Sequence, residues 1–413
     1  MALVRQKLHA ETLKDIPAAV DNALQDLHIA SVAKPGECVA VAVGSRGISH
    51  MPLIVSECVK FFKDRGLKPF IVPAMGSHGG NTPEGELSVL ARLGINEAFL
   101  SVPILAAEDV VEIGRLDIGI PILMDRRAAE ADHIVVLNRV KPHTKFHGPI
   151  ESGLTKMLTV GLGKGQGAAL YHRAAVQHTF GILQDAARHI LESRPVLFGL
   201  AILEDGYKNV SRICAVRREN WFEAERSLLE EARFVMPRIP FDPIDLLIVD
   251  EIGKDISGIG MDSNVTGRHR DIVGDFYTAP HVKRIFVRAL SPESDGNGNG
   301  IGLADVTTRR LVDALDLEKT YANALTAISP EKAAIPMYFE TDRECIEACL
   351  NTIGMVKPEA AQIIRIKNTA TLEMLLVSRA LEGEVRSNPY LQVSGPWEPM
   401  TFDDSGNLED CGF

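Results

Sequence analysis

The sequence has no long hydrophobic run, no closely paired cysteines of the CxxC type and no excess of positive charge. No apolar stretch approaches the roughly 18–20 residues that a membrane span needs. The six cysteines are scattered, so a disulfide framework is not expected. The 55 acidic residues outnumber the 44 Lys and Arg residues, and the net charge of −11 disfavours nucleic acid and anionic membranes as partners. The first residues become polar too early for a signal peptide, so we expect a cytoplasmic protein.

What the sequence does contain is typical of a globular α/β protein. Hydrophobic residues make up 46% of the chain and charged residues 24%. At 413 residues the chain is too long for one ordinary domain. Apolar runs of strand length, such as residues 39–43, alternate with amphipathic stretches, such as residues 52–65. We therefore predict two α/β domains with a ligand cleft between them.

A proline-rich segment, Met236–Pro243, marks the predicted domain boundary. Three prolines in seven residues cannot lie inside a regular element. We predict an N-terminal domain over residues 1–240 that carries most candidate functional residues. A C-terminal domain over residues 241–387, with a helix at residues 372–381, and an irregular tail over residues 388–413 should follow.

The densest group of chemically functional residues lies between residues 138 and 172. It includes Pro142-His143, Lys156 and His172 around a glycine-rich segment. A structural loop needs few imidazoles and amines, so a functional interpretation is favoured. Lys156 and His172 are sixteen residues apart. The glycines between them make one unbroken helix improbable, so the chain can bring both residues to one pocket. A long helix is predicted over residues 167–191.

The glycine-rich segment over residues 161–167 matches neither a dinucleotide fingerprint nor a Walker loop. Backbone N–H groups around Gly163 and Gly165 can still cradle a phosphate. A plain flexible connection is an equal alternative for this segment.

Two further turns follow predicted strands. Gly76-Ser77-His78 follows a strand at residues 69–74, and Ser45-Arg46 follows the strand at residues 39–43. Ligands of open α/β sheets bind at the carboxyl ends of strands. His78 is flanked by glycines that favour an exposed ring suited to acid–base chemistry, although a plain turn histidine is the alternative. Arg46 can bind a carboxylate or phosphate there, or can be a surface charge.

The C-terminal half offers one candidate binding loop. Gly258–Arg270 follows a predicted strand and mixes turn residues with arginines. Asp295–Gly300 imitates the start of a calcium loop, but its twelfth position is Val306 instead of glutamate. A glycine-rich turn is the favoured interpretation of that second segment.

With these residues in place, the chain resembles the lactate racemase family, whose members use a nickel-pincer nucleotide. The resemblance covers roughly residues 38–380 and both predicted domains. Each motif is weak alone, but their order and the spacing from the lysine to the last histidine are specific. The matching motifs are Ser45-Arg46, Gly76-Ser77-His78, Pro142-His143, Lys156 and His172.

The resemblance implies a reversible hydride transfer between a 2-hydroxy acid and the cofactor. Lys156 would tether the cofactor through a thioamide, and His172 would ligate the nickel. His78 and His143 would be the acid and base on opposite faces of the substrate carbon, and Arg46 would bind substrate. Enzymes of cofactor synthesis would be transient partners. The remaining residues expected around the cofactor are Ser45, Gly76, Ser77, Gly163 and Gly165.

Departures from the family bear on the substrate. The lactate enzymes have a Tyr-Gln pair after an Asp-x-Asn turn, and here Thr266-Gly267 follows Asp262-Ser263-Asn264. We expect Thr266, Arg268 and Arg270 to contact a 2-hydroxy acid that is larger or more polar than lactate. The segment from His143 to Lys156 is also longer and adds His147 and Glu151 to the sequence.

Two other functional classes stay open from the sequence. One is a divalent-metal hydrolase or dehydratase that uses His143, His147 and His172 as ligands. The other is a catalytically inactive protein that binds or carries the cofactor.

Overall fold

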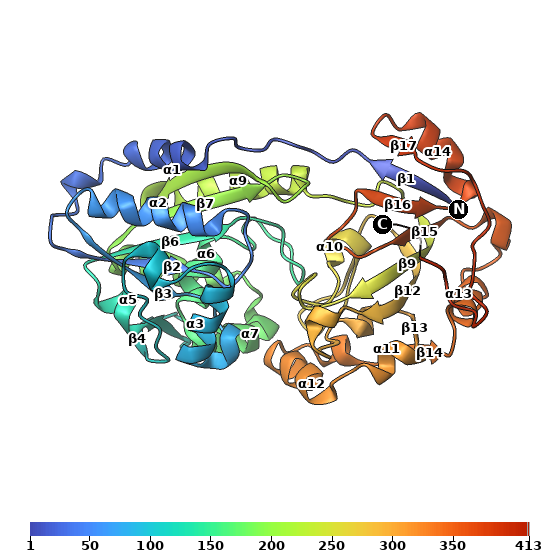
Figure 1. Cartoon of the computed structure of the whole chain (residues 1–413). Helices are drawn as coiled ribbons and strands as arrows, with labels where there is room; N and C mark the ends of the chain where they lie inside the picture. The colour runs from blue at the N-terminus through green and yellow to red at the C-terminus, as the bar shows by residue number, and fades with distance from the viewer. Residues whose placement is uncertain (411, 413) are drawn as a thin grey trace. The chain divides into compact units, whose positions relative to one another are not determined.

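The computed structural model describes residues 1–410 and 412, and Cys411 lies outside the described residues. The chain divides into two compact units (Figure 1). His9–Met236 form the N-terminal unit, and Met1–Leu8 join the residues from Pro237 onward in the C-terminal unit. The N-terminal domain was predicted to begin at residue 1, and the structure differs because the first strand pairs within the C-terminal sheet.

Among the described residues, the N-terminal unit is built on a five-stranded sheet in the order β3-β2-β6-β7-β8. The first four strands are parallel and β8 is antiparallel to β7. Strand β2 is almost wholly apolar and buried, as expected for a central parallel strand covered on both faces. The strands are β2 (Cys38–Val43), β3 (Lys68–Pro73), β6 (His133–Arg139), β7 (Val196–Glu204) and β8 (Val210–Arg217), with β4 (Val110–Arg115) and β5 (Pro121–Asp125) as a separate antiparallel pair.

The helices of this unit largely follow the sequence pattern. Thr82 caps α3 by accepting a hydrogen bond from the Gly85 N–H, and Pro83 is its first residue. The long helix predicted over residues 167–191 is wrong, because Thr179 adopts a φ of 59° and interrupts it. The helices are α1 (Ile16–Gln25), α2 (Met51–Lys63), α3 (Pro83–Arg92), α4 (Glu97–Leu100), α5 (Arg126–Glu130), α6 (Leu154–Lys156), α7 (Lys164–His178), α8 (Ile182–Ser193) and α9 (Trp221–Val235).

The C-terminal unit is built on an eight-stranded sheet in the part of the chain that the structure describes, in the order β14-β13-β12-β9-β15-β16-β1-β17. The first five strands are parallel and the last three are antiparallel to their neighbours. The strands are β1 (Ala2–Gln6), β9 (Ile244–Ile252), β12 (Val282–Leu290), β13 (Val306–Thr308), β14 (Met337–Phe339), β15 (Ile363–Ile366), β16 (Met374–Val377) and β17 (Leu391–Val393).

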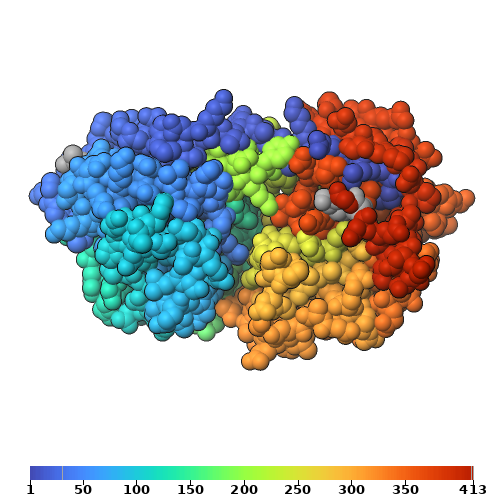
Figure 2. All heavy atoms as spheres, viewed as in Figure 1, coloured from blue at the N-terminus to red at the C-terminus, as the bar shows by residue number. Residues whose placement is uncertain are grey.

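Two predictions for this unit are wrong. The helix predicted at residues 372–381 is instead strand β16, which pairs with β15 and β1. The predicted irregular tail contains β17, which pairs with β1. In the space-filling view the dark-blue atoms at the start of the chain lie among red atoms from its last part (Figure 2). Pairing between residues this distant in sequence leaves no local signal.

The remaining elements of the C-terminal unit are short. They are β10 (Arg268–His269), β11 (Phe276–Tyr277), α10 (Ser263–Thr266), α11 (Arg309–Asp313), α12 (Leu317–Thr326), α13 (Asp342–Leu350) and α14 (Glu382–Ser387). Both units combine a mainly parallel sheet with helices, which confirms the predicted α/β class. None of the helices in the described chain is both long and apolar enough to cross a bilayer.

A buried network of charges links the central strands of the C-terminal unit. Arg365 on β15 donates to both carboxylate oxygens of Asp250 on β9, at 2.8 and 3.0 Å. Arg288 on β12 donates to Asp250 at 2.9 Å and to Asp342 of α13 at 2.8 Å. The Asp342 side chain is fully buried. Loss of one partner from such a network leaves an uncompensated charge away from water.

We therefore expect Asp342→Asn to lower the free energy of unfolding by about 3 kcal/mol, measured by urea denaturation. The control is Glu340→Gln, because Glu340 pairs with Arg309 at 3.1 Å on the exposed surface. Exposed pairs contribute less than about 1 kcal/mol. Equal losses in the two variants would contradict the importance assigned to the buried network.

Candidate active site

The loops after strands β2 and β3 meet at the carboxyl edge of the N-terminal sheet. Ser45 follows β2, and its hydroxyl oxygen lies 2.5 Å from Nδ1 of His78, which follows β3. Gly76 has a φ of 59°, and a Cβ atom there would lie 3.5 Å from Val160. Glycine thus allows the turn that carries His78 to bend back against the helical segment after Lys156.

Lys156 and His143 come into direct contact, as members of one site should. Nζ of Lys156 lies 2.8 Å from Nε2 of His143, which belongs to the loop after β6. The pKa of Lys156 is lowered to about 7, first by burial of the amine and then by the nearby positive charges of Arg46 and Lys141. A large share of the amine is therefore neutral at neutral pH, and a neutral amine is a nucleophile.

Two phenylalanines connect His143 with His172. The His143 ring centroid lies 4.4 Å from that of Phe146, which stacks on Phe180 at 4.2 Å. His172 meets Phe180 edge-on at 5.8 Å. The structure therefore gathers Lys156, His143 and His172 around one aromatic pair. No periodic pattern in the sequence indicates these phenylalanines, since Phe180 lies in the break between α7 and α8.

The segment between Lys156 and His172 is helical, with a change of direction. A π-helical turn, Met157–Gly161, follows α6, and Lys164 then adopts a φ of 54° at the start of α7. The glycines here permit close packing: a Cβ atom on Gly165 would lie 2.0 Å from the Asn81 side chain. The N–H of Gly163 donates to the Thr159 carbonyl at 3.0 Å. Gly163 cannot offer that N–H to a phosphate, which corrects this part of its predicted role.

Lys164 belongs to a buried ion cluster beneath this segment. Its Nζ donates to the carbonyl of Pro73 at 2.7 Å and to Glu86 at 2.8 Å, and it lies 3.3 Å from Asp125. Burial raises the pKa of both carboxyls, although the lysine opposes that shift. The cluster ties the start of α7 to the end of β3, so we assign it a structural role.

A buried carboxyl lies under the helix that carries Lys156. Glu225 of α9 accepts hydrogen bonds from the backbone N–H of Thr155 at 3.0 Å and from its hydroxyl at 2.5 Å. Trp221 donates to the same hydroxyl at 3.1 Å. A Cβ atom on Gly153 would lie 2.1 Å from Glu225, so a glycine is required there. Burial raises the pKa of Glu225 to about 7. Only an acidic residue on the buried face of α9 could have indicated this contact from the sequence.

The two predicted arginines of the C-terminal loop differ in their environment. Arg268 donates to Asp305 at 2.6 Å and to the Val282 carbonyl at 2.9 Å, so it takes part in the packing of its own unit. A substrate would have to displace this ion pair to reach Arg268, and the predicted role of Arg268 as a substrate ligand stays a prediction. Thr266 is fully buried in α10.

Arg270 is presented differently. Its neighbours His269 and Asp271 are buried, and Nζ of Lys332 lies 3.0 Å from each of them. His269 also stacks on Phe276, with ring centroids 4.9 Å apart. Alternation along the extended chain therefore leaves the Arg270 side chain exposed between two fixed residues.

The N-terminal part of the chain is similar to a known protein family. Residues 3–180 match the family described as the lactate racemase N-terminal domain. Over these residues the chain carries a lactate racemase-like N-terminal domain. The matched segment contains Ser45, His78, His143, Lys156 and His172. The predicted resemblance to the lactate racemase family is confirmed for this N-terminal part of the chain.

One solved structure shares the fold. A crystal structure of a Thermotoga maritima protein from a structural genomics consortium is 16% identical, with a TM-score of 0.54, covering 88% of this chain and 98% of that one. The lactate racemase apoprotein from Thermoanaerobacterium thermosaccharolyticum is 13% identical, with a TM-score of 0.46, covering 82% and 95%. At 16% identity the first likeness shows the fold alone. No curated protein matches the sequence.

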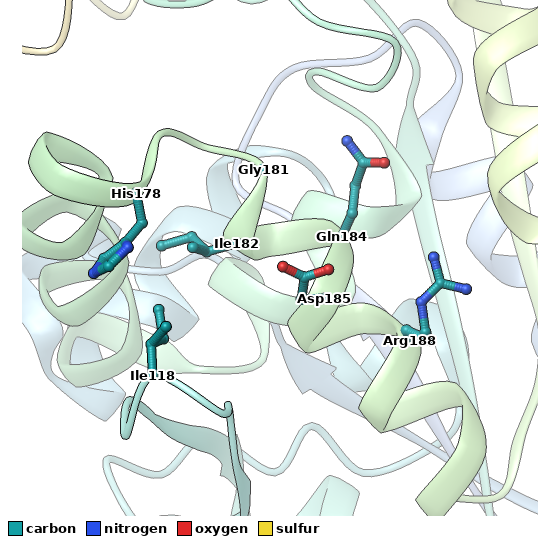
Figure 3. Close-up of a pocket in the computed structure, with 7 residues that line it drawn as sticks. All are labelled: Ile118, His178, Gly181, Ile182, Gln184, Asp185 and Arg188. Atoms are coloured by element: carbon teal, nitrogen blue, oxygen red, sulfur yellow. The ribbon is translucent and has the colours of Figure 1, made fainter.

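A surface cavity of about 370 Å³ lies elsewhere on this lactate racemase-like chain. Figure 3 shows His178 and Ile118 on one side of it and Gln184 and Arg188 on the other. Its lining includes none of the predicted site residues. The candidate active site is therefore the strand-end group around Lys156, and this cavity is separate from it.

In the described residues, no three His, Cys, Asp or Glu side chains are grouped so that they could hold a metal ion. His147 instead lies 3.5 Å from Glu151.

The buried Glu225 predicts a pH dependence of stability. Its pKa of about 7 in the folded chain exceeds the ordinary value of 4.5. The folded state then binds more protons, so this contribution to stability is full below pH 4.5 and falls as the pH rises towards 7. Between pH 5 and pH 8 the loss should be about 2.5 kcal/mol.

The measurement is urea denaturation of the wild type and of Glu225→Gln at both pH values. The variant carries no titrating carboxyl at this position. Its free energy of unfolding should therefore gain about 2.5 kcal/mol relative to the wild type between the two pH values. A difference that does not change with pH would show that Glu225 does not titrate in this range.

Proposed function

We propose that this protein is a cytoplasmic racemase or epimerase of a 2-hydroxy acid that is larger or more polar than lactate. It would use a nickel-pincer nucleotide held by Lys156 and His172. The observation that carries the proposal is the contact of Lys156 with His143 beside the aromatic pair that also holds His172. Enzymes of cofactor synthesis would be its transient partners.

The residues present fit such a cofactor. Covalent attachment through a lysine needs a neutral amine, and Lys156 has a pKa lowered to about 7 by burial and by Arg46 and Lys141. A metal held mainly by its own cofactor needs only one protein ligand. His172, half-buried on α7, can supply that ligand without a cluster of further side chains.

When bound, the cofactor would accept a hydride from the substrate carbon and return it. The chain's own residues would manage the proton of the substrate hydroxyl. His78 and His143 would take and return that proton, because an imidazole titrates near neutral pH in both directions. Ser45 orients the His78 ring through Nδ1. Arg46 is exposed beside Lys156 and would bind the substrate carboxylate through its guanidinium group.

Lys156 is predicted to carry the cofactor. Protein produced together with the cofactor-synthesis enzymes should show a nucleotide-sized mass increase by intact mass spectrometry. Lys156→Ala should show none, because it lacks the amine that forms the bond. The control is Lys164→Met, since the Lys164 amine is buried against Glu86 and should not be modified. An unchanged adduct in Lys156→Ala would refute this assignment.

The histidines should separate into two classes. His78→Ala and His143→Ala should each lower kcat by roughly 10²–10⁴ and keep nickel near its normal content, because they move protons. His172→Ala should instead lose nickel. Turnover would be measured as stereochemical scrambling over a panel of 2-hydroxy acids, and nickel by elemental analysis. If His143→Ala lost nickel and His172→Ala retained it, then His143 would be the nickel ligand and His172 the proton-transfer residue. Another outcome is a cofactor-loaded protein that neither scrambles the stereochemistry of any 2-hydroxy acid in the panel nor returns deuterium to the carbon of a 2-deuterated acid. That result would identify the protein as a cofactor carrier and not an enzyme.

Arg270 is the arginine that we expect to bind the distal part of the substrate. Arg270→Lys should lower kcat/KM by a factor that corresponds to a loss of about 2–3 kcal/mol in transition-state binding. The reason is that lysine lacks the two-pronged geometry of a guanidinium. Arg268→Lys is the matched control and should mainly lower stability, since Arg268 pairs with Asp305. Kinetics unchanged in Arg270→Lys would move the specificity pocket elsewhere.

A further inference from the structure

The loop that carries His143 is a closed structure with a carboxylate inside it. The N–H of Lys141 donates to the Ser152 carbonyl at 2.8 Å, and the N–H of Ser152 donates back at 3.3 Å. Glu151 lies within this loop and is only 2% exposed. Glu151 belongs to the segment that is longer here than in the lactate racemase family. It has no role in the proposed reaction.

Glu151 organises the loop through four groups. It accepts hydrogen bonds from the N–H of His143 at 2.6 Å, from the N–H of Gly148 at 3.0 Å and from Arg233 at 2.6 Å. The His147 ring lies 3.5 Å away. Burial alone would raise the pKa of Glu151, but the hydrogen bonds from His147, His143, Gly148 and Arg233 outweigh it and lower the pKa. The carboxylate is therefore ionised and fixed.

The folded loop also determines which nitrogen of His143 carries a proton. The backbone N–H of Lys145 donates to Nδ1 of His143 at 3.0 Å. A nitrogen that accepts a hydrogen bond has no proton, so the neutral ring carries its proton on Nε2. That Nε2 lies 2.8 Å from Nζ of Lys156. The ring N–H then donates to the lone pair of a neutral amine. A protonated Lys156 would direct its own N–H at the ring N–H, and two donors that face each other repel.

We propose that Glu151 is a positioning residue for Lys156. By folding the loop over residues 141–152, it holds His143 in the Nε2–H tautomer, which keeps the Lys156 amine neutral and nucleophilic. The functional purpose, attachment of an electrophilic cofactor, rests on the proposed function. The charges of Arg46 and Lys141 act on the same amine. Arg46 lies outside the loop over residues 141–152, whereas Lys141 closes that loop by pairing with Ser152.

The test uses the full-length protein without cofactor. Acetic anhydride at pH 7 acetylates neutral amines, and peptide mass spectrometry would follow Lys156 against Lys60, an exposed reference with 66% of its side chain accessible. We expect Glu151→Gln to slow Lys156 acetylation about fivefold relative to Lys60, because a rise of the pKa by about one unit from 7 lowers the neutral fraction of the amine at pH 7 by about that factor. The matched control is His147→Gln, which keeps Glu151 and its other three partners and should leave the Lys156 rate unchanged.

A second measurement needs no variant of Glu151. Nitrogen-15 NMR of histidine-labelled wild type, with His143→Gln used to assign the signal, should show His143 with its proton on Nε2. A proton on Nδ1 would overturn the proposal. So would an unchanged Lys156 rate in folded Glu151→Gln. Failure of cofactor loading in the wild type would instead refute the proposed function, and both of these measurements would still stand.

Discussion

The close packing of a helical segment against the ends of β2 and β3 is the constraint on which the candidate site depends. A Cβ atom on Gly44 would lie 2.7 Å from the Met157 methyl group, and one on Gly161 would lie 2.9 Å from the Ala74 carbonyl. Glycine at both positions lets the π-helical turn lie directly on the strand ends. Lys156 precedes that turn, so the same packing directs its amine towards the neighbouring loops.

Burial of ionisable groups follows from this packing and shapes the chemistry of the site. Glu225 beneath α6, Lys164 at the start of α7 and Glu151 in the His143 loop are each buried and hydrogen-bonded. An unpaired buried charge would be strongly unfavourable, so each group is held by several partners. Lys156 differs from Lys164, which faces two carboxylates. Lys156 contacts the His143 ring, and burial together with nearby positive charges lowers the pKa of its amine.

The C-terminal unit shows how neighbouring residues of one type acquire different roles. Arg268 and Arg270 are two residues apart and look equivalent in the sequence. The ion pair with Asp305 occupies the first, while the buried neighbours His269 and Asp271 leave the second exposed. The extended backbone sends alternate side chains to opposite faces, but the register that decides which face is buried depends on Lys332, about sixty residues later.

The sequence by itself determined the α/β class, most strands of the N-terminal sheet and the order of the motifs at the strand ends. These are local properties, because apolar runs and turn residues occur within a few positions of one another, and parallel strands end at one edge. Ser45 and His78 could therefore be placed together before the structure was known.

Only the tertiary structure decided the pairing of β1 with β16 and β17, the break at Thr179, the contact of Phe146 with Phe180 and the lowered pKa of Lys156. The four residues Met374–Val377 form an apolar run that suits a buried helix or strand equally well. Pairing with β15 and with β1, which is about 370 positions away, resolves the choice. The environment of Lys156 likewise comes from separate segments of the chain, with Arg46 in the loop after β2 and Lys141 and His143 in the loop after β6. Contacts between residues distant in sequence have no signature in either segment alone, since each side chain acquires its burial and charge environment only when the sheet and its loops have assembled.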